Sequence, residues 1–229
     1  MPFSLLPSDT LLPLLAVQRI ALPLAWTLVM AAVLVYLLRA YPPYLRIAGV
    51  VLAIAWNVLP TPLRPSEWLG LAFQSPGLSL QGACLLALVR AWRARHVPAV
   101  ELMACEVRWP NSLLIVIALL GWVLVLDLLA VVNVSIYAVG FTTLGVLVAL
   151  LLAAGLELMS LRSTAPGACR LRDAAALSVA AIAVHCLLRL PSGNVWDALI
   201  DPWLWLGAQA VLMFRAAMWI VRLARTARR

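Results

Sequence analysis

The chain has 229 residues, of which 65% are hydrophobic and only 11% are charged, and its mean hydropathy is +1.03. Soluble domains are roughly half apolar and about a quarter charged, so the composition excludes an ordinary soluble protein. It predicts an all-α polytopic transmembrane bundle that forms a single integral membrane domain over residues 1–229. The formal charge of +8 comes from arginines in short loops and at the C-terminus, where membrane topology needs them, so we expect no nucleic-acid partner.

Lysine is absent, which excludes a Schiff-base lysine and a phosphate-loop lysine. Cysteine and histidine are too few and too scattered for a metal or haem centre. The four cysteines show no Cys-x-x-Cys spacing, and His96 and His185 are the two histidines. We therefore expect no metal site and no cofactor.

The N-terminal quarter of the chain is predicted to hold two spans. Residues 1–18 contain three prolines, which discourage a continuous helix, so this segment is expected to lie at the membrane interface. A first span is predicted at 19–38, with Pro23 in its first turns. A second span at 45–59 is short for the ~20 residues that the hydrocarbon core requires.

The stretch Ser66–Arg95 is apolar at both ends and is interrupted by Gln74-Ser75-Pro76-Gly77. It can cross the bilayer as a kinked third span, or enter the bilayer and return to the same side. The positive-inside rule does not decide, because both paths leave the same number of arginines on each side. Its length favours crossing, which predicts about seven spans with the N-terminus outside. The alternative is six full spans and one broken or re-entrant segment, with both termini inside.

The remaining chain predicts four more spans, at 110–132, 136–159, 174–190 and 196–220. The first two are joined by the very short turn 133–135, and the third is rich in small residues that allow close helix packing in lipid. Arginines are concentrated in the loops at 90–109 and 160–173 and in the basic tail 222–229, which we expect to be cytoplasmic. Together with the use of arginine alone, this predicts a bacterial inner-membrane protein with a cytoplasmic C-terminus.

Ionisable residues at membrane depth are functional candidates, because it is costly to place them there. Asp127, His185, Arg189 and Asp201 are predicted to lie in the outer half of the bilayer. The functional interpretation is an outward-facing polar pocket with two anionic carboxylates, Arg189 as their counter-ion and His185 as a titrating group. The structural alternative is an ion pair between Arg189 and Asp201 that joins the last two spans, with Asp127 capping the 110–132 span near water.

The interruption at 74–77 frees backbone groups that are tolerated at depth only beside protein or a water-filled cavity. Many transporters build substrate sites from discontinuous helices. Gln74 and Gln81 would share a face across the break, with Cys84 about one turn beyond, so these three residues join the ligand-binding candidates. A simple proline kink is the structural alternative. Cys84 is not expected to be a nucleophile, because an apolar thiol stays protonated.

The sequence contains no catalytic motif. We therefore expect a small-solute binding or transport component, or a subunit of a larger membrane complex, with the lipid bilayer and, in the second case, other membrane subunits as partners. One alternative is a membrane-embedded enzyme acting on a lipid-linked or exported substrate, with Asp127, His185, Arg189 and Asp201 as acid, base and oxyanion groups. The other is a structural or assembly factor.

Overall fold

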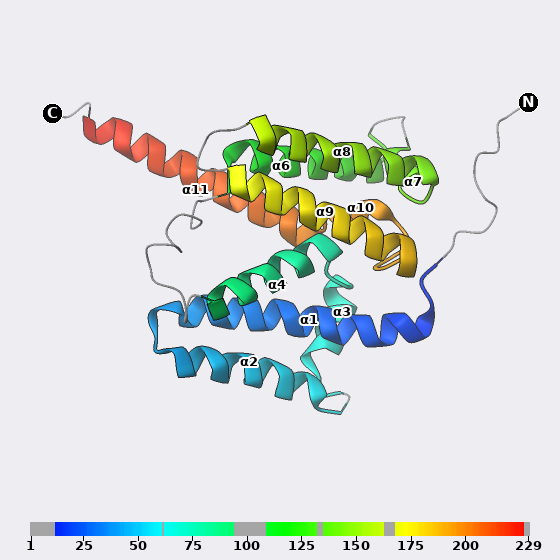
Figure 1. Cartoon of the computed structure of the whole chain (residues 1–229), viewed down its shortest axis with the longest axis vertical. Coiled ribbons are helices and arrows are strands. Elements are labelled where there is room, and N and C mark those ends of the chain that lie inside the picture. The colour runs from blue at the N-terminus through cyan, green and yellow to red at the C-terminus, as the bar shows by residue number, and fades with distance from the viewer. Residues whose placement is uncertain (1–11, 61, 94–108, 132–134, 163–167, 227–229) are drawn as a thin grey trace, which may run out of the picture.

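A computed structural model describes residues 12–60, 62–93, 109–131, 135–162 and 168–226. These residues form helices and contain no strand (Figure 1). The helices are α1 (Leu15–Leu37), η1 (Leu38–Ala40), α2 (Pro43–Val58), α3 (Pro65–Phe73), α4 (Leu78–Arg93), α6 (Asn111–Leu128), α7 (Ile136–Val139), α8 (Thr143–Arg162), α9 (Ala168–Leu188), α10 (Val195–Leu199) and α11 (Pro202–Thr226).

Within the described residues, five helical segments are long and apolar enough to cross a membrane. They are Leu15–Ala40, Asn111–Leu128, Thr143–Arg162, Cys169–Leu188 and Pro202–Thr226. The prediction of a helical membrane protein is supported in this form. The count of seven spans is not confirmed, because α2 has only 16 residues and Ser66–Arg95 contains two separate helices of 9 and 16 residues.

Most of the helices run between the same two ends of the molecule (Figure 1). At one end lie the C-terminal ends of α1, α4, α8 and α11 and the N-terminal ends of α2, α6 and α9. We call it the arginine-rich end, because the terminal turns that meet there carry most of the described arginines: Arg39, Arg46, Arg90, Arg93, Arg162, Arg170, Arg172, Arg222 and Arg225. The opposite end holds the first turns of α1, the end of α9, and α7 and α10.

The segment Ser66–Arg95 contains a true break, so the simple-kink alternative is wrong. Helix α3 ends at Phe73, α4 begins at Leu78, and residues 74–77 are not helical. Gln74 has a φ of 60°, which turns the chain away from the axis of α3. In Figure 1, α3 lies across the other helices, whereas α4 runs on towards the arginine-rich end. There Arg90 forms an ion pair of 2.6 Å with Asp173 in the first turns of α9.

Two predicted spans are also interrupted in the structure. The predicted span at 136–159 is divided into α7 and α8, and the predicted span at 196–220 is divided into α10 and α11. At the first interruption a Cβ on Gly140 would collide with the side chains of Asn194 and Trp196, so only glycine fits there. At the second, Pro202 occupies the first turn of α11, where its missing N–H costs little.

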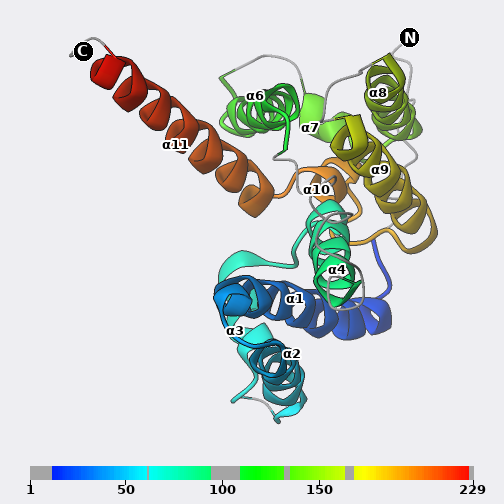
Figure 2. The ribbon, with the colours of Figure 1, turned by 60° about the vertical axis from the view of Figure 1, so that its left-hand side comes forward.

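The helices pack as pairs: α1 with α2, α6 with α11, and α8 with α9. Helix α4 contacts α1 on one side and α9 and α10 on the other, so it connects the N-terminal helices to the rest (Figure 2). The α8–α9 pair is close because small residues line it, and the buried Ala149 and Ala153 meet Ile182 and Trp196. In Figure 2, α11 extends away from the body towards its C-terminal end.

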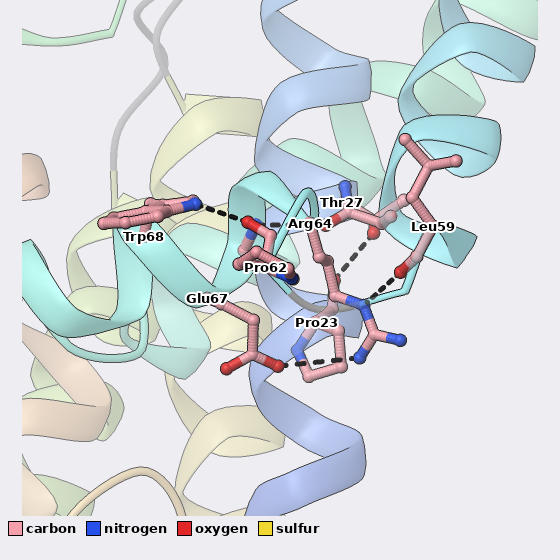
Figure 3. Close-up of polar contacts among 9 residues, drawn as sticks. Pro23, Thr27, Leu59, Pro62, Arg64, Glu67 and Trp68 are labelled. Carbon is pink, nitrogen blue, oxygen red and sulfur yellow. Dashed lines mark hydrogen bonds and ion pairs between the residues drawn. The ribbon is translucent and has the colours of Figure 1, made fainter.

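The loop between α2 and α3 is held by its own polar contacts (Figure 3). Arg64 donates from Nε to the Leu59 carbonyl at 3.2 Å, and its guanidinium lies 3.6 Å from Glu67. Trp68 donates from Nε1 to the Pro62 carbonyl at 2.6 Å. These contacts fix the point at which the chain enters α3.

Candidate functional site

Asp201 lies between the N-termini of two helices and is only 4% exposed. Its Oδ1 accepts the amide of Leu204 at 2.6 Å, which caps α11. Its Oδ2 accepts the amide of Gly77, also at 2.6 Å, and Gly77 directly precedes α4. A helix N-terminus carries unpaired N–H groups and the positive end of the helix dipole, so one carboxylate serves two helices here.

This contact requires glycine at position 77. A Cβ added there would lie 2.7 Å from the backbone oxygen of Asp197 and 3.1 Å from the Asp201 side chain. The absence of a side chain therefore lets the backbone of the break approach α10 and the start of α11 closely enough for the hydrogen bond to form.

Two carbonyls of the break also have side-chain partners. The Gln74 carbonyl accepts from Trp26 Nε1 at 3.0 Å, and the Pro76 carbonyl accepts from Gln81 Nε2 at 2.7 Å. Trp26 and Phe73 both contact the ring of Trp203 edge to face. Side chains from α1, α4 and α11 thus satisfy or cover the break, as non-helical backbone at membrane depth requires.

A second polar group surrounds Asp197 on α10. Its Oδ2 accepts hydrogen bonds from the Tyr137 hydroxyl at 2.8 Å and from the Ser192 hydroxyl. Asn194 caps α10 and donates to the Tyr137 carbonyl at 3.0 Å. Burial is the main cause that raises the pKa of the Tyr137 phenol above its ordinary range, and the hydrogen bond to Asp197 is the second. Asp197 is close enough to Asp201 and His185 for its charge to act on both.

Asp127 joins this group indirectly. Its Oδ2 accepts the amide of Tyr137 at 2.5 Å, so the carboxylate caps the short helix α7. We expected a cap on the 110–132 span near water. The structure instead uses Asp127 to close the connection between that span and the next, because the chain returns directly beside the end of α6.

His185 is completely buried. Its Nδ1 lies 2.9 Å from the Leu190 carbonyl, and because a carbonyl only accepts, Nδ1 must carry the proton. Nε2 is then an acceptor, and it is buried without a partner among the described residues. Arg189 follows one turn later, close enough for its charge to act on the ring.

The predicted ion pair between Arg189 and Asp201 is wrong. No salt bridge joins them in the described part of the chain, and Asp201 accepts backbone amides instead. The amides are available because both helices begin at this point. Burial raises the pKa of Asp201 above its ordinary value, although the amides of Leu204, Gly77 and Trp203 act against this shift.

The three candidates near the break are used differently from our expectation. Gln74 and Gln81 do not share a helix face, because residues 74–77 are not helical. Gln74 contributes its backbone carbonyl and has an exposed side chain, whereas Gln81 turns its amide back to the break. Cys84 is a half-buried free thiol, and it lies close enough to Asp201 for the carboxylate charge to act on it.

Sequence reasoning missed Gly77, Tyr137, Ser192, Asn194 and Asp197 as members of this site. Two local signals were present: asparagine is a favoured N-cap, and Asp201-Pro202 pairs a favoured N-cap with a favoured first helical residue. Asn194 lies in the turn between two predicted spans, and Asp201-Pro202 lies inside the predicted span 196–220, where hydropathy concealed it.

The described residues contain no group of three or more His, Cys, Asp or Glu side chains that could hold a metal ion. Comparison of the chain with protein-family models, with curated proteins and with solved structures finds no match.

Proposed function

We propose that the chain is a non-catalytic integral membrane component that binds or transports a small solute where α4, α9 and α10 pack together, beside the contact of Gly77 with Asp201. The observation that carries this proposal is the Asp201 carboxylate, which receives amides from the starts of two helices at an interruption of a predicted span. Transporters commonly place their substrate sites at discontinuous helices, whose N-termini point at the bound groups.

The arrangement of the helices supports the same proposal. The N-terminal group α1–α4 meets the C-terminal group mainly through contacts of α4 with α9 and α10, close to the hydrogen bond between Gly77 and Asp201. Two groups of helices that meet around one polar site are suited to the rocking motions by which transporters change access.

The enzyme alternative has less support from the geometry. The Ser192 hydroxyl donates to Asp197 and not to a histidine, and the protonated nitrogen of His185 is held by a carbonyl. In the described part of the chain, no hydroxyl or thiol is hydrogen-bonded to a histidine base, an arrangement that nucleophilic catalysis generally needs.

We also propose that the arginine-rich end faces the cytoplasm of a bacterial cell, with the C-terminus inside. The concentration of arginines at the helix ends that meet there supports this orientation. Other membrane subunits are proposed partners, because little of the apolar α11 is buried against the rest of the chain.

Uptake into proteoliposomes tests the function. Vesicles containing the full chain would be incubated with a defined mixture of isotope-labelled small polar metabolites, and their contents measured by mass spectrometry. At least one solute should enter above the level of protein-free vesicles, and Asp201→Asn should abolish its entry. Glu67→Gln is the matched control, since it removes a charge from an exposed carboxylate near the same end. Entry of no solute with the wild-type chain would favour the assembly-factor alternative.

A further inference from the structure

Three side chains near the end of α9 each have polar atoms without a described partner, and we call them the His185 cluster: His185, Arg189 and Asp197. The buried Nε2 of His185 is an acceptor without a partner. Both hydrogen bonds to Asp197 reach Oδ2, so Oδ1 accepts none from the described residues. The Arg189 side chain makes no ion pair with any described residue.

The fold brings these groups together at the end opposite the arginine-rich one. Arg189 directly follows α9, one turn after His185, and α10 with Asp197 packs against α9. The negative charge of Asp197 and the positive charge of Arg189 both act on the ring of His185. Acceptor atoms and a donor group therefore lie in the neighbourhood of one buried imidazole.

The backbone at Arg189 adopts a conformation that is unusual for a residue with a side chain. Its φ is 58°, in the left-handed region at the end of a helix, where glycine is the usual residue. An L-residue there is strained, because its Cβ crowds the following carbonyl oxygen. In the described structure no hydrogen bond or ion pair of the side chain offsets this strain.

We propose that the His185 cluster binds a small zwitterionic solute such as a free amino acid, with its ammonium group on Asp197 Oδ1 and His185 Nε2 and its carboxylate on Arg189. The proposal rests on the proposed function and names its substrate class. An ammonium has only donors and fits two acceptors, whereas a guanidinium binds a carboxylate through paired N–H groups. A zwitterion also brings no net charge, so it avoids burying an uncompensated ion.

Asp127 and Asp201 take a different part in this arrangement. Their oxygens accept backbone amides of Tyr137, Gly77 and Leu204, so they fix the frame around the cluster and leave solute contacts to other residues. The proposed site is thus centred on the end of α9 and the start of α10, beside the break.

Thermal unfolding of the purified full chain tests the proposal with four probes. Alanine carries both charged groups, methylammonium only the cation, acetate only the anion, and glycine betaine both charges but no N–H donor. Alanine should raise the melting temperature saturably, and each of the other probes should bind more weakly. Arg189→Gln should weaken alanine binding about tenfold or more, the cost of losing a charged hydrogen bond. Asp197→Asn should weaken alanine and methylammonium binding alike.

Glu67→Gln is the matched control, because it removes a charge from a partly exposed carboxylate outside the proposed site and should leave alanine binding unchanged. Arg189→Gln is expected to fold, since its side chain holds no described partner. The proposal is overturned if alanine leaves the wild-type melting temperature unchanged, if methylammonium binds as tightly as alanine, or if Arg189→Gln binds alanine normally. Failure of alanine binding beside Asp201-dependent uptake of another solute would reject the zwitterion and retain the transport function. Alanine binding without uptake of any solute would retain the zwitterion site and reject the transport function.

Discussion

The carboxylate of Asp201 accepts the backbone amide of Gly77 across 124 positions of sequence, at a distance of 2.6 Å. The contact joins the break between α3 and α4 to the first turn of α11. It also explains why a carboxylate is retained in a nearly anhydrous position: two buried amides have no other acceptor in the described structure.

Replacing Asp201 with alanine should lower the free energy of unfolding by about 2 kcal/mol or more, because buried amides at two helix starts lose their acceptor. Asp201→Asn should cost less, because its carbonyl oxygen still accepts one amide and the buried charge is removed. Denaturant unfolding in mixed micelles measures both effects. Glu67→Ala, at an exposed carboxylate, is the control. Equal stability of Asp201→Ala and Glu67→Ala would contradict the role of Asp201 as a double cap.

Gly77→Ala should destabilise the protein by about 1–3 kcal/mol, because the new Cβ would press against the backbone oxygen of Asp197. Gly207→Ala in α11 is the matched control, since nothing lies within 4 Å of a Cβ there. Alanine is favoured over glycine in a helix, so Gly207→Ala should be neutral or slightly stabilising. The comparison uses the same unfolding assay, and a harmless Gly77→Ala would argue against close approach at the break.

Tyr137→Phe should change how stability depends on alkaline pH. In the folded protein the pKa of Tyr137 is raised, so the folded state keeps a proton that the unfolded chain releases near pH ~10. The contribution of this group is fully present below that pH and is lost as the pH rises through the folded pKa. Tyr137→Phe should therefore lose stability less steeply above pH ~10 than the wild type. Tyr44→Phe, at an exposed ring, should follow the wild-type curve.

The path of Ser66–Arg95 can be tested with reporters at fixed positions. If the segment crosses, a reporter after residue 42 and one at the C-terminus should both be cytoplasmic, and a reporter after residue 60 should be external. Fusions active only in the cytoplasm or only outside it would assign each position. An external reporter at residue 42 with a cytoplasmic C-terminus would reject crossing and restore the re-entrant alternative.

The helical membrane architecture was predictable because a bilayer demands long apolar helices, and composition reports that demand directly. The breaks after Val139 and Leu199 were not predictable from average hydropathy, since apolar residues continue on both sides of each break. Proline and glycine marked the break at 74–77, but a proline kink and a true break share the same local sequence. What separates them is the Gly77–Asp201 contact, which no local pattern records.

The same limit applies to the candidate site. Rarity of charge in an apolar stretch drew attention to Asp127, His185 and Asp201, each of which has a backbone partner in the structure. It could not pair them, because each partner is a backbone group that every residue possesses. Tyr137 and Ser192 were overlooked for a related reason: hydroxyl side chains are common near membrane interfaces and acquire meaning only once Asp197 lies beside them.

The separation of Gly77 and Asp201 in sequence also delays the formation of their hydrogen bond during synthesis of the chain. Ribosomes add roughly 5–20 residues per second. The interval between synthesis of Gly77 and synthesis of the acceptor for its amide, 124 residues later, is therefore roughly 6 to 25 s. For most of that interval α1 to α4 are already made, while the break between α3 and α4 lacks the acceptor of its Gly77 amide. The break can therefore reach its final arrangement only after Asp201, the residue directly before α11, has been synthesised.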